Sequence, residues 1–439
     1  MAYCGYIVKV SKLEKHPNAD RLQLATFFNA TTAVSLEVKI GDIGLYLPSD
    51  GQLSVEFCDK NHLCRKNSKG EPDSGYLDPD KRNIKAIKLR GSYSDGIYMP
   101  LKALDYLFAD GDASAHLSVG DMVDTINGVE ICKKYIPRTN SSDRINAPKT
   151  RKQKQEEREK TPYFAQHIDT PQLRFCADMF KPGDVICLTE KVHGTSSRNA
   201  NTLTISYKRN IFDKIFHKPG KEIRNYKYVV GTRRTTVHNN STGYYQTNDF
   251  RLDWGKKFLN HLRQGEEVFG EIAGFVQPGQ PIMGTCENSK INDKSFIKRY
   301  GETTTFTYGC SDTDETKPLN RYFIYRMTYT TPEGDVIEYP WDMVKLRAEQ
   351  LGFEIVPELD RFIYTTEEDF YARINKWLDV PSTIDPTHVI EGVVVRALNN
   401  PGFMVAKEKS ISFKILEGII KENAAAPDME EAEEILAEL

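Results

Sequence analysis

The 439-residue sequence lacks several features that would assign a chain to a class at once. Its eight cysteines include no Cys-x-x-Cys pair, and Cys58, His62 and Cys64 offer only three close ligands, so we favour free thiols in a reducing compartment over a zinc site. The chain start has no charged segment followed by a long apolar run, and no stretch approaches the ~20 apolar residues of a membrane span. We therefore expect a cytoplasmic protein that does not contact a membrane.

A strong net charge is also missing. The formal charge of −3 at pH 7 gives no overall attraction to nucleic acid, so any basic surface must be local. Hydrophobic residues make up 39% of the chain and charged residues 28%, which is the composition of an ordinary globular protein with ample core. The length leaves room for about two or three domains.

Residues 1–137 have the pattern of a small β-rich module. Alternating apolar and polar side chains predict strands over residues 6–10 and 22–27. The segments HPNADRL (residues 16–22) and IKLRGSYSDGI (residues 87–97) resemble parts of the tRNA-binding OB modules attached to some synthetases. The resemblance implies a small β-barrel whose face binds RNA or a nicked duplex. A structural β domain without a ligand is the alternative.

Charge patterning divides the rest of the chain. Residues 138–160 are rich in Lys, Arg and Glu, which is typical of a solvated linker. Residues 161–422 alternate strand and helix patterns and contain every further motif. Residues 423–439 form an acidic tail, either an amphipathic helix or a frayed end, which we do not expect to contact nucleic acid.

The segment CLTEKVHGTSSRN (residues 187–199) is the centre of this second domain. A short apolar run predicts a buried strand that ends at Lys191, and the pattern breaks at His193 and Gly194. A lysine held there can act as a nucleophilic amine beside a phosphate, and Gly194 lets the backbone approach because it has no Cβ. The spacing alone is a weak signal, since a surface lysine at a strand end has the same pattern.

Four further segments follow, each at the end of a plausible strand: VVGTRRT (229–235), EVFGEIAG (267–274), RYFIYRM (321–327) and VIEGVVVR (389–396), the last followed by MVAKEKSISFK (404–414). Glu391 lies inside a run so apolar that its carboxylate is costly to bury without a cation or a metal. It is therefore the strongest purely physical indication of a site.

In this order the motifs resemble those of the covalent nucleotidyltransferase superfamily of ATP-dependent ligases and mRNA capping guanylyltransferases. Their sequences are most similar to those of RNA ligases. The resemblance covers about residues 160–420. It implies an α+β fold in which a nucleotidyltransferase domain with ATP-grasp-like antiparallel sheets follows the OB-type barrel. Because the chain ends soon after the lysine pair, we expect no C-terminal OB or helical domain, as in a group of RNA ligases that seal nicks with an RNA 3′-OH strand.

The resemblance also implies roles for individual residues. Lys191 would attack the α-phosphate of ATP and form lysyl-AMP, although a free lysine with a pKa near 10.4 is neutral in only about one case in a thousand at pH 7.5. Nearby cations can lower such a pKa and neutralise the phosphates. The implied assignments are Arg234, Lys407 and Lys409 as these cations, Glu271 and Glu391 as holders of Mg²⁺ or Mn²⁺, Tyr325 stacked on adenine, Glu190 at the adenine edge and Gly194 beside the phosphates.

Some assignments stay open. Arg233 competes with Arg234 for the family arginine, and Lys414 competes with Lys409. His193 stands where many family members carry aspartate, although histidine also occurs among RNA ligases, and we do not name it a metal ligand.

We therefore predict a monomeric ATP-dependent RNA ligase that joins 3′-OH and 5′-phosphate ends, at nicks, through lysyl-AMP and 5′-adenylylated nucleic acid. The alternatives are a capping guanylyltransferase, an RNA-binding protein with an inactive transferase domain and, as a close variant, a DNA ligase. Since every motif lies beyond the linker, the sequence also predicts that the ATP site is complete without residues 1–137.

Overall fold

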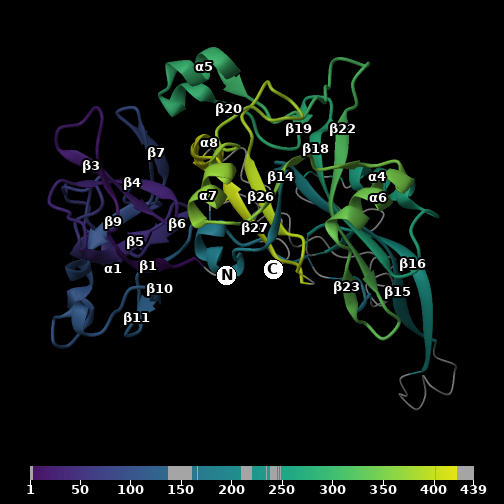
Figure 1. Cartoon of the computed structure of the whole chain (residues 1–439), viewed down its shortest axis with the longest axis horizontal. Coiled ribbons are helices and arrows are strands. Elements are labelled where there is room, and N and C mark those ends of the chain that lie inside the picture. The colour runs from purple at the N-terminus through teal and green to yellow at the C-terminus, as the bar shows by residue number, and fades with distance from the viewer. Residues whose placement is uncertain are drawn as a thin grey trace.

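The computed structural model describes residues 3–136, 161–165, 167–208, 220–233, 235–237, 245, 247, 249–400 and 402–422. The predicted linker, Arg234 and the acidic tail lie outside the described residues. The N-terminal module occupies one end of the molecule, and the last described strand and helix lie between it and the large sheet (Figure 1). Within these ranges no helix has the length and apolar character needed to cross a membrane.

The N-terminal module consists of short antiparallel strands around two small cores. Its larger sheets have the orders β10-β1-β5-β9 and β2-β3-β4. The strand predicted over residues 22–27 coincides with β3, and the one over 6–10 overlaps β1. The elements are β1 (Gly5–Lys9), β2 (Leu13–Lys15), β3 (Leu22–Phe27), β4 (Ala30–Ser35), β5 (Ile43–Leu47), β6 (Gly51–Leu53), α1 (Val55–Lys60), β7 (Ala86–Leu89), β8 (Ser92–Asp95), β9 (Ile97–Pro100), β10 (Met122–Val123), β11 (Thr125–Ile126), β12 (Val129–Glu130) and β13 (Cys132–Lys134).

Two large, mainly antiparallel sheets and a separate two-stranded sheet form the second domain, as expected for a mixed α+β fold. The smaller has the order β25-β14-β26-β27, and the larger runs β17-β16-β15-β18-β22-β23. The strands are β14 (Val185–Lys191), β15 (Thr195–Lys208), β16 (Lys221–Gly231), β17 (Thr236–Val237), β18 (Glu266–Gln277), β19 (Gln280–Pro281), β20 (Cys286–Glu287), β21 (Thr303–Thr304), β22 (Asn320–Thr330), β23 (Val336–Glu338), β24 (Glu354–Ile355), β25 (Glu358–Ile363), β26 (Gly392–Ala397) and β27 (Val405–Lys409).

Helices cover these sheets and close two further cores. They are α4 (Asp249–Phe258), α5 (Lys294–Tyr300), α6 (Trp341–Leu351), α7 (Glu367–Asn375) and α8 (Ile411–Glu422), with short 3₁₀ turns at η4 (Leu173–Phe175), η5 (Ala177–Met179) and η6 (Asn288–Ile291), and at η1 (Leu101–Leu107) and η2 (Ala113–Ala115) in the module. Thr366 caps α7 by accepting a hydrogen bond from the backbone of Asp369, which satisfies one of the free donors of its first turn.

The chain crosses from the small sheet to the large one directly after Lys191. Lys191 pairs with Gly392 at the end of β14, and β15 starts at Thr195 on the other sheet. Gly194 makes this crossing possible, because a Cβ there would lie 2.3 Å from the carbonyl oxygen of Ile272. The glycine that sequence analysis assigned to phosphate approach thus has a packing reason of its own, the close approach of β18.

Candidate active site

A pocket opens beside Lys191 between the two sheets. It holds about 680 Å³, counting its open mouth. Side chains from segments far apart in the chain line it together. Those that belong to the sequence motifs are Lys191, Ser196, Arg233, Glu271, Tyr325 and Lys407. Arg234, the arginine preferred in the sequence analysis, lies outside the described residues, and its competitor Arg233 lines the pocket.

Glu391 lies directly behind Lys191. The Lys191 Nζ is 2.8 Å from Glu391 Oε1, and the Lys409 Nζ is 3.6 Å from the same oxygen. The carboxylate is 1% exposed, whereas the side chain of Lys191 is 16% exposed toward the pocket. A buried carboxylate requires cationic partners, so the costly residue of the apolar run is balanced by two lysines of the predicted motifs.

The sequence pattern placed Glu391 inside an apolar run, but β26 begins one residue after it. Its backbone oxygen accepts a hydrogen bond from the Ser410 N–H at 2.9 Å, which joins it to the residue after Lys409. The preceding Ile390 N–H donates to the Val380 carbonyl. Glu391 is therefore held by a loop rather than by the interior of a strand.

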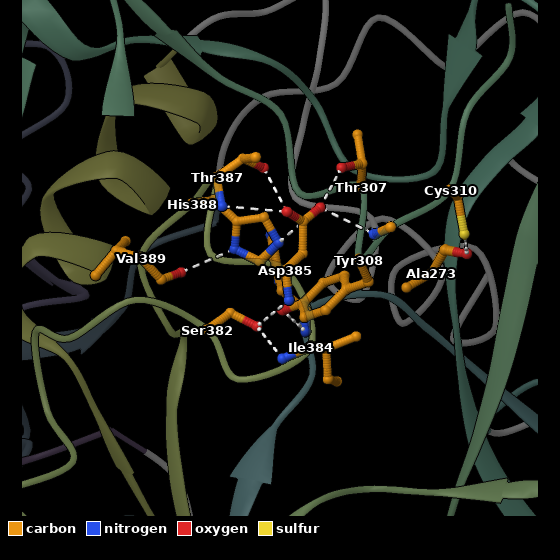
Figure 2. A network of polar contacts seen from close by, with 12 residues as sticks. Ala273, Thr307, Tyr308, Cys310, Ser382, Ile384, Asp385, Thr387, His388 and Val389 are labelled. Atoms are coloured by element: carbon orange, nitrogen blue, oxygen red, sulfur yellow. Dashed lines mark hydrogen bonds and ion pairs between the residues drawn. The ribbon is translucent and has the colours of Figure 1, made fainter. Parts of the chain in front are cut away.

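That loop is fixed by a polar network around Asp385 (Figure 2). The Thr307 hydroxyl and the Gly309 N–H donate to Asp385 Oδ2 at 2.7 and 2.8 Å, and Thr387 donates to the other oxygen. Burial alone would raise the pKa of Asp385, but hydrogen bonds led by those of Thr387 and Thr307 lower it to about 2. The carboxylate stays charged and ties the loop before Glu391 to the segment around Tyr308.

Tyr308 completes this support on the other side of Lys191. Its hydroxyl accepts a hydrogen bond of 2.7 Å from the backbone N–H of His193. The His193 ring packs edge-on against Phe306 and Phe413, and its Nδ1 lies 3.8 Å from Glu391 Oε2. The histidine that replaces the aspartate of many relatives thus sits in an aromatic enclosure.

Glu190 points into the same loop. Its carboxylate accepts hydrogen bonds from the Ser382 hydroxyl at 2.5 Å and from the Thr383 N–H at 3.0 Å. Burial raises the pKa of Glu190, and these hydrogen bonds oppose the rise. The residue borders the pocket, but its carboxylate oxygens are engaged in fastening the loop to β14.

Glu271 faces Lys191 from the large sheet. It pairs in register with Ser196, whose hydroxyl donates to Glu271 Oε2 at 3.4 Å. The side chain is buried and lines the pocket. The two buried carboxylates therefore come from different sheets, Glu271 from β18 of the large sheet and Glu391 from the residue before β26 of the small one.

Tyr325 forms part of the far wall. Its hydroxyl lies 3.4 Å from His167 Nδ1, and burial raises the pKa of the phenol, so the ring is neutral. Arg233 Nη2 is 2.5 Å from Asp169 Oδ1, which fixes the guanidinium at the pocket. His167 and Asp169 had no motif signal in the sequence.

Arg396 and Phe403 are further wall residues that sequence reasoning missed. Arg396 is buried and lies 4.6 Å from the ring centre of Trp341, and burial lowers its pKa to about 10. The reasoning that found Glu391, a charge inside an apolar run, would have found Arg396 as well. Phe403 follows a loop without periodicity and carries no such signal.

Two groups of residues lie away from the pocket. Lys414, the competitor of Lys409, donates to Asp95 of the N-terminal module instead, at 2.8 Å. Cys58 and Cys64 are buried, whereas His62 is exposed and contacts Asp73. The described residues contain no group of three or more His, Cys, Asp or Glu side chains arranged to hold a metal ion.

Comparisons with known proteins identify the family and the fold. A family profile described as RNA ligase matches residues 184–416, more than half of the chain. No curated protein sequence matches significantly. Solved structures of an RNA ligase from Naegleria gruberi do: a lysine-to-methionine mutant with AMP and Mn aligns with a TM-score of 0.54 and 15% identity, over 93% of this chain and 97% of that chain.

Two further structures of the Naegleria gruberi enzyme give the same result. A lysine-to-alanine mutant with ATP and Mn has a TM-score of 0.54 and 15% identity, over 93% of this chain and 98% of that chain. The enzyme with PPi has a TM-score of 0.54 and 14% identity, over 93% and 97%. At such identity the likeness establishes the fold, and the profile establishes the family. The chain belongs to the RNA ligase family of the nucleotidyltransferase superfamily.

Proposed function

We propose that this protein is an ATP-dependent RNA ligase that joins 3′-OH and 5′-phosphate ends, at nicks, through lysyl-AMP and 5′-adenylylated nucleic acid. The observation that carries the proposal is the Lys191 amine, held 2.8 Å from Glu391 at the mouth of a pocket that Glu271, Tyr325 and Lys407 also line. The AMP and ATP present in the structures of the Naegleria gruberi enzyme support a nucleotide in this pocket.

In the first step the Lys191 nitrogen forms a bond to the α-phosphorus of ATP, and the bond from that phosphorus to the bridging oxygen breaks, releasing pyrophosphate. Lys191 Nζ must lose a proton in this step, and Glu391 Oε1 lies within hydrogen-bond distance to accept it. Lys407 and Arg233 at the pocket wall would neutralise phosphate charge, and the Tyr325 ring would stack on adenine. Lys409 contacts Glu391, whereas Lys414 contacts Asp95, so we assign the role of the second motif lysine to Lys409.

A divalent cation fits the same site. Glu271 lines the pocket with Lys191, Glu391 contacts Lys191, and both carboxylates are buried; oxygen donors of this kind suit Mg²⁺ or Mn²⁺, which keep several waters beside phosphates. The Mn in the Naegleria gruberi structures supports this assignment. When bound, the cation supplies positive charge to the phosphates.

For residues 1–137 we propose an OB-type module that grips RNA. The two segments resembling tRNA-binding modules meet in space: His16 Nε2 lies 3.2 Å from the Leu89 carbonyl oxygen, and the Asn18 side-chain amide donates to the Arg90 carbonyl at 3.0 Å. Arg90 and Gly91 at this contact are exposed, and so is Arg21 of the first segment. Cations there would contact phosphates, and such binding weakens as salt rises.

The test is a pair of assays with the full-length protein. We expect label from α-labelled ATP, and not from GTP, to be transferred to Lys191, and a nick with an RNA 3′-OH strand to be sealed when RNA or DNA is varied on each side. Preference for GTP would favour a capping guanylyltransferase. Failure to form any nucleotide adduct would favour an RNA-binding protein with an inactive transferase domain, and equal sealing of all-DNA nicks would favour a DNA ligase.

A further inference from the structure

Strand β27 carries charge on both of its faces. Neighbouring side chains of a strand point to opposite sides, so Lys407 and Lys409 share one face and Glu408 lies on the other. Lys407 lines the pocket and Lys409 contacts Glu391. Glu408 is buried, and its Oε1 is 3.6 Å from the Lys414 Nζ. The motif strand thus borders the active site on one face and a second group of charges on the other.

This second group is centred on Asp95, at the end of β8 in the N-terminal module. Asp95 Oδ2 accepts a hydrogen bond from Arg174 Nη1 and another from Lys414 Nζ, both at 2.8 Å. The Asp95 side chain is 0% exposed and that of Arg174 is 1% exposed. With Glu408 the group contains two carboxylates and two cations, so its formal charges balance. We call these four residues the interdomain cluster.

Arg174 and Lys414, the two cations that contact Asp95, lie on segments that contact or directly follow β27. Arg174 lies in η4, just after residues 171 and 172: the Lys407 N–H donates to the Pro171 carbonyl at 2.8 Å, and Gln172 forms a bridge with Lys407. The Arg174 Nε also donates to the Gln172 side chain at 2.8 Å. Asp95 is therefore connected, through one arginine, to the backbone of a pocket lysine.

The second connection runs through α8. Lys414 lies in the first turns of this helix, which begins two residues after Lys409. Further along the helix, Glu417 accepts a hydrogen bond of 2.7 Å from the Lys409 Nζ. The helix therefore holds Lys409 directly, and Asp95 holds the helix.

We propose that Asp95 is a positioning residue for the first chemical step, an N-terminal carboxylate that sets the placement of Lys407 and Lys409 by holding Arg174 and Lys414. The inference rests on the proposed function, because it assigns the N-terminal module a role in forming lysyl-AMP in addition to gripping RNA. Asp95 is not among the residues that line the pocket with Lys191, and it acts only through β27.

The physical reason is charge balance in a sealed site. Removing one partner of a buried ion pair leaves an uncompensated charge, which the surrounding segments must move to solvate. Here the segments that would move are η4 and α8, the two that flank β27. A shift of about 1 Å far from the reacting atoms can lower a rate about 100-fold.

The test measures a single turnover of lysyl-AMP formation from α-labelled ATP and Mg²⁺, without nucleic acid, at several ATP concentrations. Asp95→Asn keeps the shape and leaves the cluster with one excess positive charge. We expect the maximal rate to fall roughly 10- to 100-fold, with the half-saturating ATP concentration changed less than about threefold, because the adenine wall around Tyr325 is untouched.

A double variant separates positioning from general damage. Asp95→Asn with Lys414→Met restores the charge balance between Arg174 and Glu408, so we expect it to form lysyl-AMP faster than either single variant. Asn29→Ala is the matched control, since it removes an exposed hydrogen bond to Asn375 at the same domain interface, and its rate should equal that of the wild type. Thermal unfolding of each variant checks folding.

The outcomes are distinct. A normal maximal rate for a folded Asp95→Asn overturns the inference, and so does a double variant slower than both singles, because additive loss means that the cluster only stabilises the fold. An unfolded Asp95→Asn with a folded, active double variant supports charge balance. If the wild-type protein itself takes no label from ATP, the proposed function fails before Asp95 is tested.

Discussion

Strand β27 separates two similar charge groups that differ in access to solvent. On one face Glu391 lies between Lys191 and Lys409, whose side chains are 16% and 14% exposed. On the other face Asp95 lies between Arg174 and Lys414, which are 1% and 7% exposed. Each carboxylate is buried between two cations. The first group borders the pocket through Lys191, so in the proposed mechanism it is open to a phosphate that enters there, whereas the second group is closed to an incoming ligand.

This difference in solvent access indicates which role each kind of ion pair suits. A sealed ion pair adds little net stability, because desolvation offsets the attraction, yet breaking it by removing one partner is costly. Such a pair is suited to fixing one arrangement of the segments that carry it. A half-open pair is suited to chemistry, because its cations remain available to a substrate. Substitutions on the two faces of β27 should therefore impair lysyl-AMP formation in different ways.

The largest expected effect is on the open face. In the proposed mechanism Lys191→Ala removes the nitrogen that forms the bond to the α-phosphorus, so transfer of label from ATP to the protein should be abolished. The same variant should still seal, in part, a nick whose 5′ end has been adenylylated beforehand, since that step does not need the free amine. Labelling at the wild-type level would remove Lys191 from the mechanism.

Glu391→Gln should come next. The substitution keeps the size of the side chain but removes the charge 2.8 Å from Lys191, so we expect lysyl-AMP formation to slow on the order of 100-fold or more. The loss should exceed that of Asp95→Asn, since Glu391 touches the nucleophile and Asp95 does not. If the two variants slow the reaction equally, the two faces do not differ as argued here.

Glu271→Gln tests the metal assignment separately. The side chain lines the pocket from the large sheet, so its loss should appear as a higher Mg²⁺ or Mn²⁺ requirement together with slower label transfer. Titration of each metal at fixed ATP measures this. An unchanged metal requirement at a normal rate would exclude Glu271 as a metal-holding residue.

The sequence predicted the open face much better than the sealed one. Lys191 ends β14, whereas Glu271 and Tyr325 lie within β18 and β22, and strand alternation fixes which way each side chain points. Asp95 lies 79 residues from Arg174 and 319 from Lys414, and no local pattern reports contacts over such separations.

The same limit explains the expectation about residues 1–137. Every motif lies beyond the linker, which predicted an ATP site complete without the module. Because Asp95 is the module's partner for Arg174 and Lys414, a chain without the module would lose the carboxylate that both cations share and would leave Glu408 beside two positive charges. We therefore now expect the module to affect the first step as well as the gripping of RNA.

Tyr325→Ala should give a smaller and different effect. Stacking of a base on an aromatic ring is worth ~1–3 kcal/mol, so the ATP concentration at half-saturation should rise roughly 5- to 150-fold while the maximal rate changes little. Tyr325→Phe is the control, since it keeps the ring and loses only the hydroxyl near His167. An ATP requirement that is the same in both variants and the wild type would count against stacking.

The smallest expected effect belongs to a neutral contact beside the sealed face. The Tyr93 hydroxyl and the Ser412 hydroxyl form a hydrogen bond of 2.8 Å between β8 and α8, two residues from Asp95 and two from Lys414. Tyr93→Phe removes this bond but keeps the ring that lies under the Lys88 amine. The free energy of unfolding should fall by only about 0.5–1.5 kcal/mol, because a neutral hydrogen bond is largely replaced by water.

Lysyl-AMP formation by Tyr93→Phe should stay within about twofold of the wild type, since the charges of the interdomain cluster remain balanced. Denaturant unfolding and the single-turnover assay measure the two quantities on one preparation. Should Tyr93→Phe slow the first step as strongly as Asp95→Asn, any loosening between β8 and α8 would suffice. The buried charge would then have no special part in placing β27, and the contrast between its two faces would reduce to a difference in solvent exposure.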